Sequence, residues 1–484
     1  MQAPSCAISK SLVRRCLAHA QRRTSQHEAR VAALVLSCFL LTSIGWMLWM
    51  DELSCFESTM SVEFLTLVVS YAVQAGGAAA YTAYARRCPT RITSRTCTAA
   101  ILLFVTALLP VVFGSYATVV GFGMAANLLC GMLQAHYVTR LAQLVASERR
   151  ATVFGGAYAA STVASWLLSH VATGLVQGVP GLVSCCALAI PAACATMWVE
   201  RVAQTDPSDT GASDAPDGVM DAMTRTFAPC LALVLLMSVT KNLGFGFPVQ
   251  DLAEGVDLAT SRLFYGAGLL GAGLVFDRDR SFGMFFCVCS LMLPFVSLAL
   301  VGTGTSAMTI WALSYLLFGF FSVYRVVLVA DLASSTQQVW LASAGLMFGR
   351  LGDALGSYAN LALASNTVAL VALAAISFVA TMCVARHVHR SHASAESPEP
   401  APAPNEPPAI DEQAAFEAYA RAHDLSNRQQ EVLRLMLDGL TNQQIGTKLV
   451  VSNNTVKFHV RNVLHKTGCS NRAELQQSYK DSKR

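Results

Sequence analysis

The most distinctive chemistry in this sequence lies near its C-terminus, where donor side chains gather on one predicted helix. Val456, Val460 and Leu464 recur at every fourth position and predict the inward face of that helix. The opposite face would carry Lys457, Phe458, His459, Arg461 and Asn462. Apart from Phe458, these side chains can donate to base edges and phosphates of a DNA duplex. The pattern therefore predicts a helix that enters a DNA groove; the alternative is an ordinary solvated helix face.

Capping signals predict the helices that position this face. Ser426, with Gln429 three residues on, has the pattern of a capping box, and Gly439 is a typical helix end. Thr441 would cap a second helix. A turn at Val450-Val451 would lead to Ser452, the cap of the DNA-facing helix from Asn453 to about Lys466. Gly468 would end it, and Ser470 would cap a fourth helix to about Ser478.

Residues 425–475 resemble the LuxR-type helix-turn-helix. The matching positions are Glu431, Val432, Leu433, Gly439, Asn442, Ile445, Leu449, Ser452, Thr455, Val456, Lys457, His459, Val460, Lys466, Gly468, Arg472 and Leu475. The resemblance departs at Gly446 and Thr467, neither of which is expected to face DNA.

The resemblance implies roles for individual side chains. Lys457, Phe458 and Arg461 would face bases or the adjoining backbone, Ser452 and Thr455 would hold phosphates, and Lys466 and Arg472 would add phosphate contacts. The fourth helix would form a homodimer contact. The full predicted DNA-binding set is Ser452, Thr455, Val456, Lys457, Phe458, His459, Arg461, Asn462, Lys466 and Arg472.

A second group of chemically active side chains lies inside apolar stretches, where an ionised group costs at least about 2.5 kcal/mol. Arg350 and Asp353 are three residues apart and can pair on one helix face. With Lys241 and Arg325 they predict a ligand cavity for an anionic small molecule. The alternative is an internal ion pair that holds helices together, with Arg325 and His136 reaching the membrane interface.

The composition predicts a polytopic membrane protein. Of the 484 residues, 54% are hydrophobic and 13% charged, where soluble proteins average about 25% charged. Apolar runs predict twelve spanning helices, at about 31–50, 61–84, 97–113, 117–138, 153–176, 180–199, 226–247, 258–276, 281–302, 306–330, 338–360 and 365–385. The expected fold is all-α: a bundle of six plus six spans and a small four-helix C-terminal domain.

Charge in the connecting segments predicts the orientation. Lys and Arg occur in the N-terminal arm, in the connections after the second, fourth, sixth and eighth predicted spans, and after the last span, whereas the alternate connections carry none. By the positive-inside rule both termini are cytoplasmic, in a bacterial inner membrane. The predicted regions are a basic arm (1–30), two six-span halves (31–199 and 226–385), a polar linker (200–225), an extended Pro-rich tether (386–411) and the DNA-binding domain (412–484).

The six-plus-six plan resembles the major facilitator superfamily. Gly273-Leu274-Val275-Phe276-Asp277-Arg278 is similar to that superfamily's loop signature, although the equivalent Tyr84-Ala85-Arg86-Arg87 lacks the aspartate. The 15 cysteines show no metal-ligand spacing, and no phosphate-binding loop or hydrolase motif occurs. We expect no enzyme, cofactor or metal.

Together these features predict a membrane-bound transcription regulator. Its membrane part would sense a small-molecule effector or the state of the bilayer, and its C-terminal domain would bind promoter DNA. Two alternatives stay open: a secondary transporter with an appended regulatory domain, and a scaffold whose tail recruits a protein.

Overall fold

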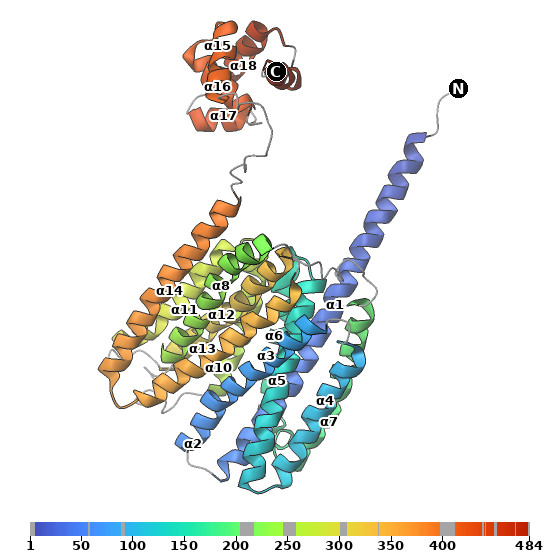
Figure 1. Ribbon diagram of the computed structural model, residues 1–484, viewed down its shortest axis with the longest axis vertical. Coiled ribbons are helices and arrows are strands. Elements are labelled where there is room, and N and C mark those ends of the chain that lie inside the picture. Colours follow the sequence, from blue (N-terminus) through green and yellow to red (C-terminus); the bar gives the residue numbers. More distant parts are fainter. Residues whose placement is uncertain are drawn as a thin grey trace. The chain divides into compact units, whose positions relative to one another are not determined.

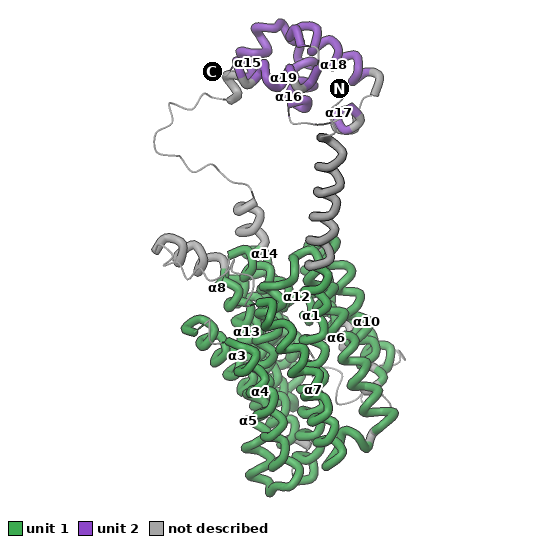
Figure 2. Tube along the Cα trace, turned by 90° about the vertical axis from the view of Figure 1, so that its right-hand side faces the viewer, with its two compact units in different colours: residues 1–396 green, residues 397–484 purple. Residues whose placement is uncertain are grey.

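The computed structural model consists of helices and loops, and the residues it describes contain no β-strand. These are residues 5–56, 59–88, 92–203, 217–244, 258–300, 307–336, 338–396, 412–437, 440, 442–449, 453–469 and 471–482. They form two compact units, residues 1–396 and 397–484 (Figure 2). The predicted all-α class is therefore confirmed.

Unit 1 is a bundle of long helices (Figure 1). The first group is α1 (Ser5–Ser54), a continuous run of α2 (Thr59–Glu63), π-helical η1 (Phe64–Val69) and α3 (Ser70–Arg87), then α4 (Ser94–Phe113), α5 (Tyr116–Leu144), α6 (Ser147–His170) and α7 (Gly178–Ala203). The second group is α8 (Asp217–Gly244), α10 (Leu258–Phe276), α11 (Ser281–Leu300), α12 (Ala307–Ser335), α13 (Ala342–Ala362) and α14 (Thr367–Glu396). Each predicted span coincides largely with one of these helices.

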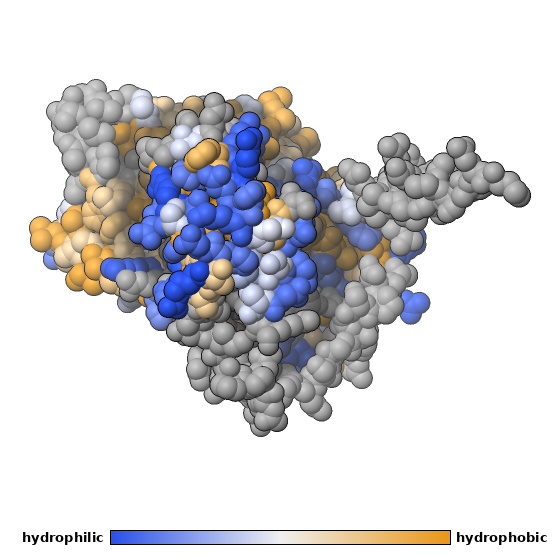
Figure 3. All heavy atoms as spheres, turned by 90° about the horizontal axis from the view of Figure 1, so that it is seen from above, coloured by the Kyte–Doolittle hydropathy of each residue, from blue (hydrophilic) through white to orange (hydrophobic). Residues whose placement is uncertain are grey.

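Eight helices in the described part of the chain are long and apolar enough to cross a membrane: α1, the run ending in α3, α4, α5, α6, α7, α12 and α14. The described portions of α8, α10 and α11 form shorter apolar helices. Large side chains on the outside of the bundle are strongly exposed, among them Val368 (81%) and Phe113 (68%). Hydrophobic residues, drawn in orange, are visible at the outer surface in Figure 3. Exposed apolar surface on this scale indicates a membrane protein.

Four of the helix contacts in the first group recur in the second. The pairs α1·α6, α1·α7, α3·α5 and α4·α5 correspond in order to α8·α13, α8·α14, α10·α12 and α11·α12. The two groups meet through α3 with α13 and through α6 with α10, which again are corresponding pairs. Unit 1 is thus two similarly packed six-helix halves that face each other.

Glycines allow the closest of these approaches. A Cβ on Gly77 of α3 would lie 2.0 Å from the carbonyl oxygen of Leu128 on α5. The same happens in the second half, where a Cβ on Gly268 of α10 would lie 2.0 Å from the carbonyl oxygen of Leu316 on α12. Small residues let membrane helices pack backbone to backbone, and here they do so at corresponding places.

Two boundaries differ from the predicted ones. The basic arm is not a separate element, because α1 already begins at Ser5. The tether predicted as extended from residue 386 is helical at first, since α14 continues to Glu396. The run Val384-Ala385-Arg386-His387-Val388 has no helix breaker, and its apolar members keep packing on the bundle. Residues 397–411 lie outside the described part.

Unit 2 contains α15 (Glu412–Ala422), α16 (Asn427–Leu437), α17 (Asn442–Leu449), α18 (Asn453–Thr467) and α19 (Arg472–Asp481). Its core includes Phe416, Tyr419, Leu425, Val432, Leu433, Met436, Ile445, Val456, Val463 and Leu475. Four helices were predicted here, and α15 is a fifth. Phe416, Tyr419 and Ala420 are its buried face, at the spacing of an amphipathic helix.

The caps follow the sequence signals with one correction. Gln429 Oε1 accepts from the backbone amide of Ser426 at 2.9 Å, as in a capping box. Gly468 ends α18 with φ of +68°, a conformation that favours glycine. The cap of α19 is Asn471, whose Oδ1 accepts from the amide of Glu474 at 2.9 Å, and not Ser470. Gly439, Thr441, the Val450-Val451 turn and Ser470 lie outside the described residues.

Candidate DNA-binding surface and membrane cavity

Helix α18 presents an exposed face of mixed chemistry. Thr455, Lys457, Phe458 and Arg461 are all exposed. The Phe458 ring is 60% exposed, which is unusual for so large an apolar side chain on a small domain. We call these four residues the α18 face. It combines two cations, a hydroxyl and an apolar group able to contact a thymine methyl.

The buried side of α18 fixes this face in place. Val456 and Val463 are fully buried in the core of unit 2, and Val460 and Leu464 pack against it. Val456 was also predicted among the DNA-binding residues, but its side chain has no exposed surface here and instead belongs to the core. His459 and Asn462, at the border of the face, are half-buried.

Two predicted phosphate ligands have partners within unit 2. Arg472 donates to the carbonyl oxygen of Leu440 and, at 2.5 Å, to Oδ1 of Asn442, the first residue of α17. Partial burial lowers the pKa of Arg472 from its ordinary value. Lys466 Nζ donates to the carbonyl oxygen of Asp424 at 2.5 Å. Arg472 thus ties α19 to α17. Ser452, the remaining predicted phosphate ligand, lies outside the described residues.

In unit 1 the four predicted cavity residues meet in one cluster. The Asp353 carboxylate lies 3.2 Å from Lys241 Nζ, 3.1 Å from Arg325 Nη1 and 3.6 Å from Arg350 Nη1. Asp353 is 1% exposed. We call this group the Asp353 cluster. One carboxylate faces three cations drawn from α8, α12 and α13, so the cluster carries two positive charges in excess.

Uncharged side chains complete the cluster. Asn242 Nδ2 donates to Asp353 Oδ1 at 2.8 Å, and Arg350 Nη2 donates to Gln134 Oε1 of α5 at 3.0 Å. The Arg350 guanidinium also stands 5.2 Å from the ring centre of Tyr71 on α3. Arg350 therefore connects the cluster in the second half to two helices of the first half. The alternative interpretation placed Arg325 at the membrane interface. Instead, Arg325 pairs with Asp353 inside the bundle.

Two cavities adjoin the Asp353 cluster. The first, which we call the arginine cavity, has a volume of about 310 Å³ and is bordered by Tyr71, Gln74, Tyr158, Arg262, Tyr265 and Arg350, among others. The second measures about 390 Å³ and is bordered by Lys241 and Asn242. Tyr71, Tyr265 and Tyr315 border both. The walls come from both halves, so movement of one half against the other reshapes them.

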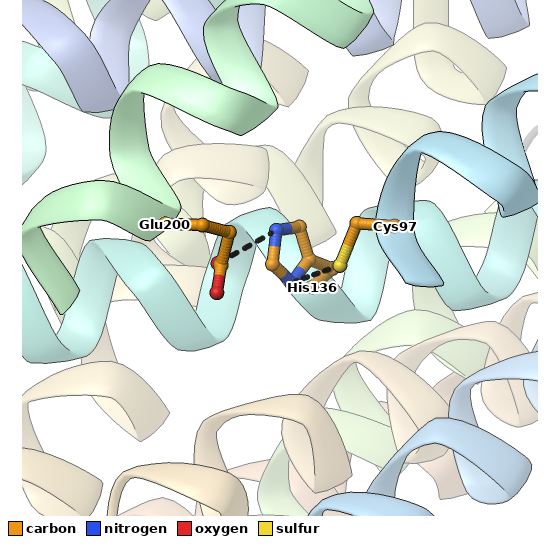
Figure 4. A group of neighbouring side chains, drawn as sticks. All are labelled: Cys97, His136 and Glu200. Atoms are coloured by element: carbon orange, nitrogen blue, oxygen red, sulfur yellow. Dashed lines mark hydrogen bonds and ion pairs between the residues drawn. The ribbon is translucent and has the colours of Figure 1, made fainter. Parts of the chain in front are cut away.

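A further buried group joins α4, α5 and α7 (Figure 4). His136 is 2% exposed, with Nε2 3.4 Å from Glu200 and Nδ1 3.7 Å from Cys97 Sγ. Arg140 donates to both Glu200 oxygens, at 2.7 and 2.9 Å. Cys97 and Glu200 approach different nitrogens of the ring, and one donor atom from each of the three residues lies within 4.8 Å of the other two. The group is an ion-pair network, and His136 does not reach an interface.

A second ion-pair network, which the sequence analysis did not predict, joins the two halves. It lies at the end of unit 1 that holds the start of α1 and the end of α14. Asp331 of α12 pairs with Arg150 of α6 and, at 2.9 Å, with Arg280. Asp277, after α10, accepts from the backbone amides of Ala151 and Thr152 at 2.9 and 2.7 Å. Asp331 falls just after a predicted span and is half-buried, so its ion pairs were not foreseeable from hydropathy alone.

Comparison with known proteins identifies the C-terminal part. Residues 423–478 match the model of the bacterial regulatory proteins of the luxR family. Transcriptional regulatory protein DegU of Brevibacillus brevis is 46% identical over 52 residues, which cover 11% of this chain and 22% of that protein. Transcriptional activator protein PhzR of Pseudomonas fluorescens is 37% identical over 70 residues, 14% of this chain and 29% of that protein.

The chain therefore spans less than a third of the length of these curated relatives. The matched stretch runs from the end of α15 to α19, and includes the whole of the described α18 face. The C-terminal unit of this chain contains a LuxR-family helix-turn-helix domain.

Proposed function

We propose that this protein is a membrane-bound one-component transcription regulator: unit 1 senses an effector, and unit 2 binds promoter DNA in a sequence-specific way. One observation carries the proposal. A LuxR-family domain with a solvent-exposed basic and aromatic helix face occurs in one chain with a part whose described residues include eight helices long and apolar enough to cross a membrane.

For DNA binding, the support comes from the side chains of the α18 face as well as from the LuxR-family match. Lys457 and Arg461 are exposed one helical turn apart, with Phe458 beside Lys457. On our proposal this face enters the major groove, while Thr455 contacts a backbone phosphate. Two copies of the domain, joined through α19, would read paired half-sites. The exposed residues on α19, such as Glu474 and Gln477, make that contact a polar one.

For orientation, the support is the distribution of charge. The start of α1 and the end of α14 lie at the same end of unit 1 (Figure 1). The start of α6, with Arg149 and Arg150, and the connection after α10, with Arg278 and Arg280, belong to that end too, since Arg150 and Arg280 both pair with Asp331. Positive charge marks the cytoplasmic side. Both termini are therefore cytoplasmic on this proposal, in the compartment that holds the DNA.

For effector binding, the support is the arginine cavity. Its wall reaches from Arg350, in the middle of α13, to Trp46 and Met47 near the far end of α1. It thus extends away from the end that carries the Asp331 network. An effector in this cavity contacts both halves at once, and it shifts the protein only if it binds one arrangement of the halves better than the other.

A transporter with an appended regulatory domain is the second candidate. The observation that favours it is the repeated packing of two six-helix halves around a cavity, which suits alternating exposure of a site to the two sides. Uptake of effector into vesicles, lost in Arg350→Ala, would support transport.

The proposal is tested on the full chain in its membrane. Cells are treated with a protein–DNA crosslinker, membranes are isolated, and the DNA attached to the chain is sequenced. We expect recurrent sites with inverted half-sites for the wild type, and none for the double variant Lys457→Ala/Arg461→Ala. A reporter fused after Arg484 checks orientation. Activity of that reporter outside the cell, or the same DNA recovered with the double variant, would refute the proposal.

A further inference from the structure

The arginine cavity also constrains what can fill it. Among the described residues that line it, Arg262 and Arg350 carry charge and none is acidic. Asp353, which pairs with Arg350, is already shared with two further cations. Among the described residues that line this cavity no acidic side chain balances Arg262 and Arg350, and an anion is the occupant that would balance them.

Atoms without a partner add two further requirements. Arg350 Nε is buried and has no hydrogen-bond partner, although other atoms of its guanidinium contact Gln134 and Asp353. Gln74 Oε1 is also buried and without a partner. Unpaired buried polar atoms are costly, and a ligand that presents an acceptor to Arg350 and a donor to Gln74 removes both costs.

The orientation of the Gln74 amide is fixed by its neighbours. Asn127 Nδ2 donates to the carbonyl oxygen of Gly123 at 2.9 Å, so Asn127 Oδ1 must be the acceptor for Gln74. Gln74 Nε2 donates to that oxygen at 2.8 Å. The free atom of Gln74 is therefore the carbonyl oxygen, which accepts and does not donate.

Aromatic rings supply the rest of the wall. Tyr71, Tyr158, Tyr265, Tyr315, Phe39 and Trp46 border the cavity. Tyr158 and Tyr265 meet edge to face, with ring centres 5.6 Å apart and hydroxyl oxygens 2.9 Å apart. Such a wall favours a flat ring over a flexible chain or a fully hydrated ion. A volume of about 310 Å³ is at the lower end for small-molecule sites.

Resting on the proposed function, the geometry points to the effector class: a small aromatic carboxylic acid that also carries a hydroxyl or amino donor. Its carboxylate binds Arg350, its ring lies among the tyrosines, and its donor reaches Gln74 Oε1. Arg262 adds positive charge towards the far end of the cavity.

The test uses the purified full chain in detergent and five probes, with binding followed by calorimetry. Hydroxybenzoate (the 3- and 4-isomers) offers charge, ring and donor; benzoate lacks the donor, 4-hydroxybenzamide lacks the charge, and acetate lacks the ring. We expect one hydroxybenzoate isomer to bind best. Benzoate should bind several-fold more weakly, and the amide and acetate about tenfold or more weakly than that isomer.

Two variants assign the contacts. Arg350→Gln should weaken the acids about tenfold or more, while Arg278→Gln, an exposed arginine outside this cavity, should change nothing. Arg350→Gln leaves Asp353 paired with Lys241 and Arg325, so we expect the chain to stay folded. If Arg350→Gln does not fold, Arg262→Gln, at the other end of the cavity, tests instead whether positive charge is needed to bind the acids. Gln74→Leu should erase the advantage of hydroxybenzoate over benzoate.

Equal binding of acid and amide would overturn the anionic assignment, and equal binding of acetate and benzoate would overturn the aromatic one. Failure of every probe to bind refutes the effector class. The regulator proposal fails separately, through the DNA-crosslinking experiment, which requires no added effector.

Discussion

At the scale of single residues, we propose that the exposed side chains of the α18 face contact DNA, while the buried side chains of α18 hold the helix in place. Lys457→Ala or Arg461→Ala should each weaken binding of a target duplex by residues 412–484 about 5- to 150-fold, the loss expected when one good base or phosphate contact is removed. Titration of labelled duplex measures this. The fragment has its own hydrophobic core, so it can be studied alone. Arg421→Ala, an exposed arginine on α15, is the matched control; equal losses in all three variants would reject the α18 face.

For Val456 we predict the opposite result: a substitution should lower stability and leave DNA affinity unchanged. Its side chain is 0% exposed, so Val456→Ala should lower the free energy of unfolding of the fragment by about 1.5–3 kcal/mol. Urea unfolding followed by circular dichroism measures the change. DNA affinity of the remaining folded protein should stay close to that of the wild type. Normal stability combined with lost affinity would restore Val456 to the DNA-binding set.

At the scale of elements, backbone contact between helices decides which glycines can change. Gly77→Ala places a methyl group 2.0 Å from the Leu128 carbonyl oxygen and should force α3 away from α5. We expect a loss of about 1–3 kcal/mol in stability, typical of overpacking. Thermal unfolding of the purified chain in detergent measures it.

The adjacent residue is the control for this change. A Cβ on Gly76 would meet only a Leu128 methyl at 3.9 Å, an ordinary contact. Gly76→Ala should therefore be tolerated. If both variants unfold at the wild-type temperature, α3 and α5 do not touch at Gly77.

Elements also show how far the sequence could predict this structure. Apolar periodicity and length located the membrane-type helices, and capping residues located the start and end of α18, because both signals are local. The partners of buried charges are not local. Arg350, Arg325 and Lys241 were recognised as candidates, but nothing in the sequence showed that all three face Asp353. Arg150 and Asp331, 181 positions apart, form an ion pair that only the packing of α6 on the second half creates.

At the scale of the whole molecule, the proposal requires that a substitution can weaken effector binding without weakening DNA binding. Arg350→Ala should leave duplex binding by residues 412–484 unaffected, since that residue is not in the fragment. In cells, the effector concentration that gives a half-maximal reporter response should rise about tenfold or more, because a charged contact is lost. A dose–response series with a promoter fusion measures it, with membrane abundance of the chain as the control. An unchanged dose–response curve would remove Arg350 from the sensing role.

The presence of both units in one chain has a spatial consequence. On the proposed function, the regulator cannot diffuse through the cell body to search for its operator, since unit 1 stays in lipid. The chromosome must instead bring the operator to the envelope. Induction should then depend on where the target gene is inserted, with loci that visit the cell periphery often responding faster than loci held in the nucleoid interior.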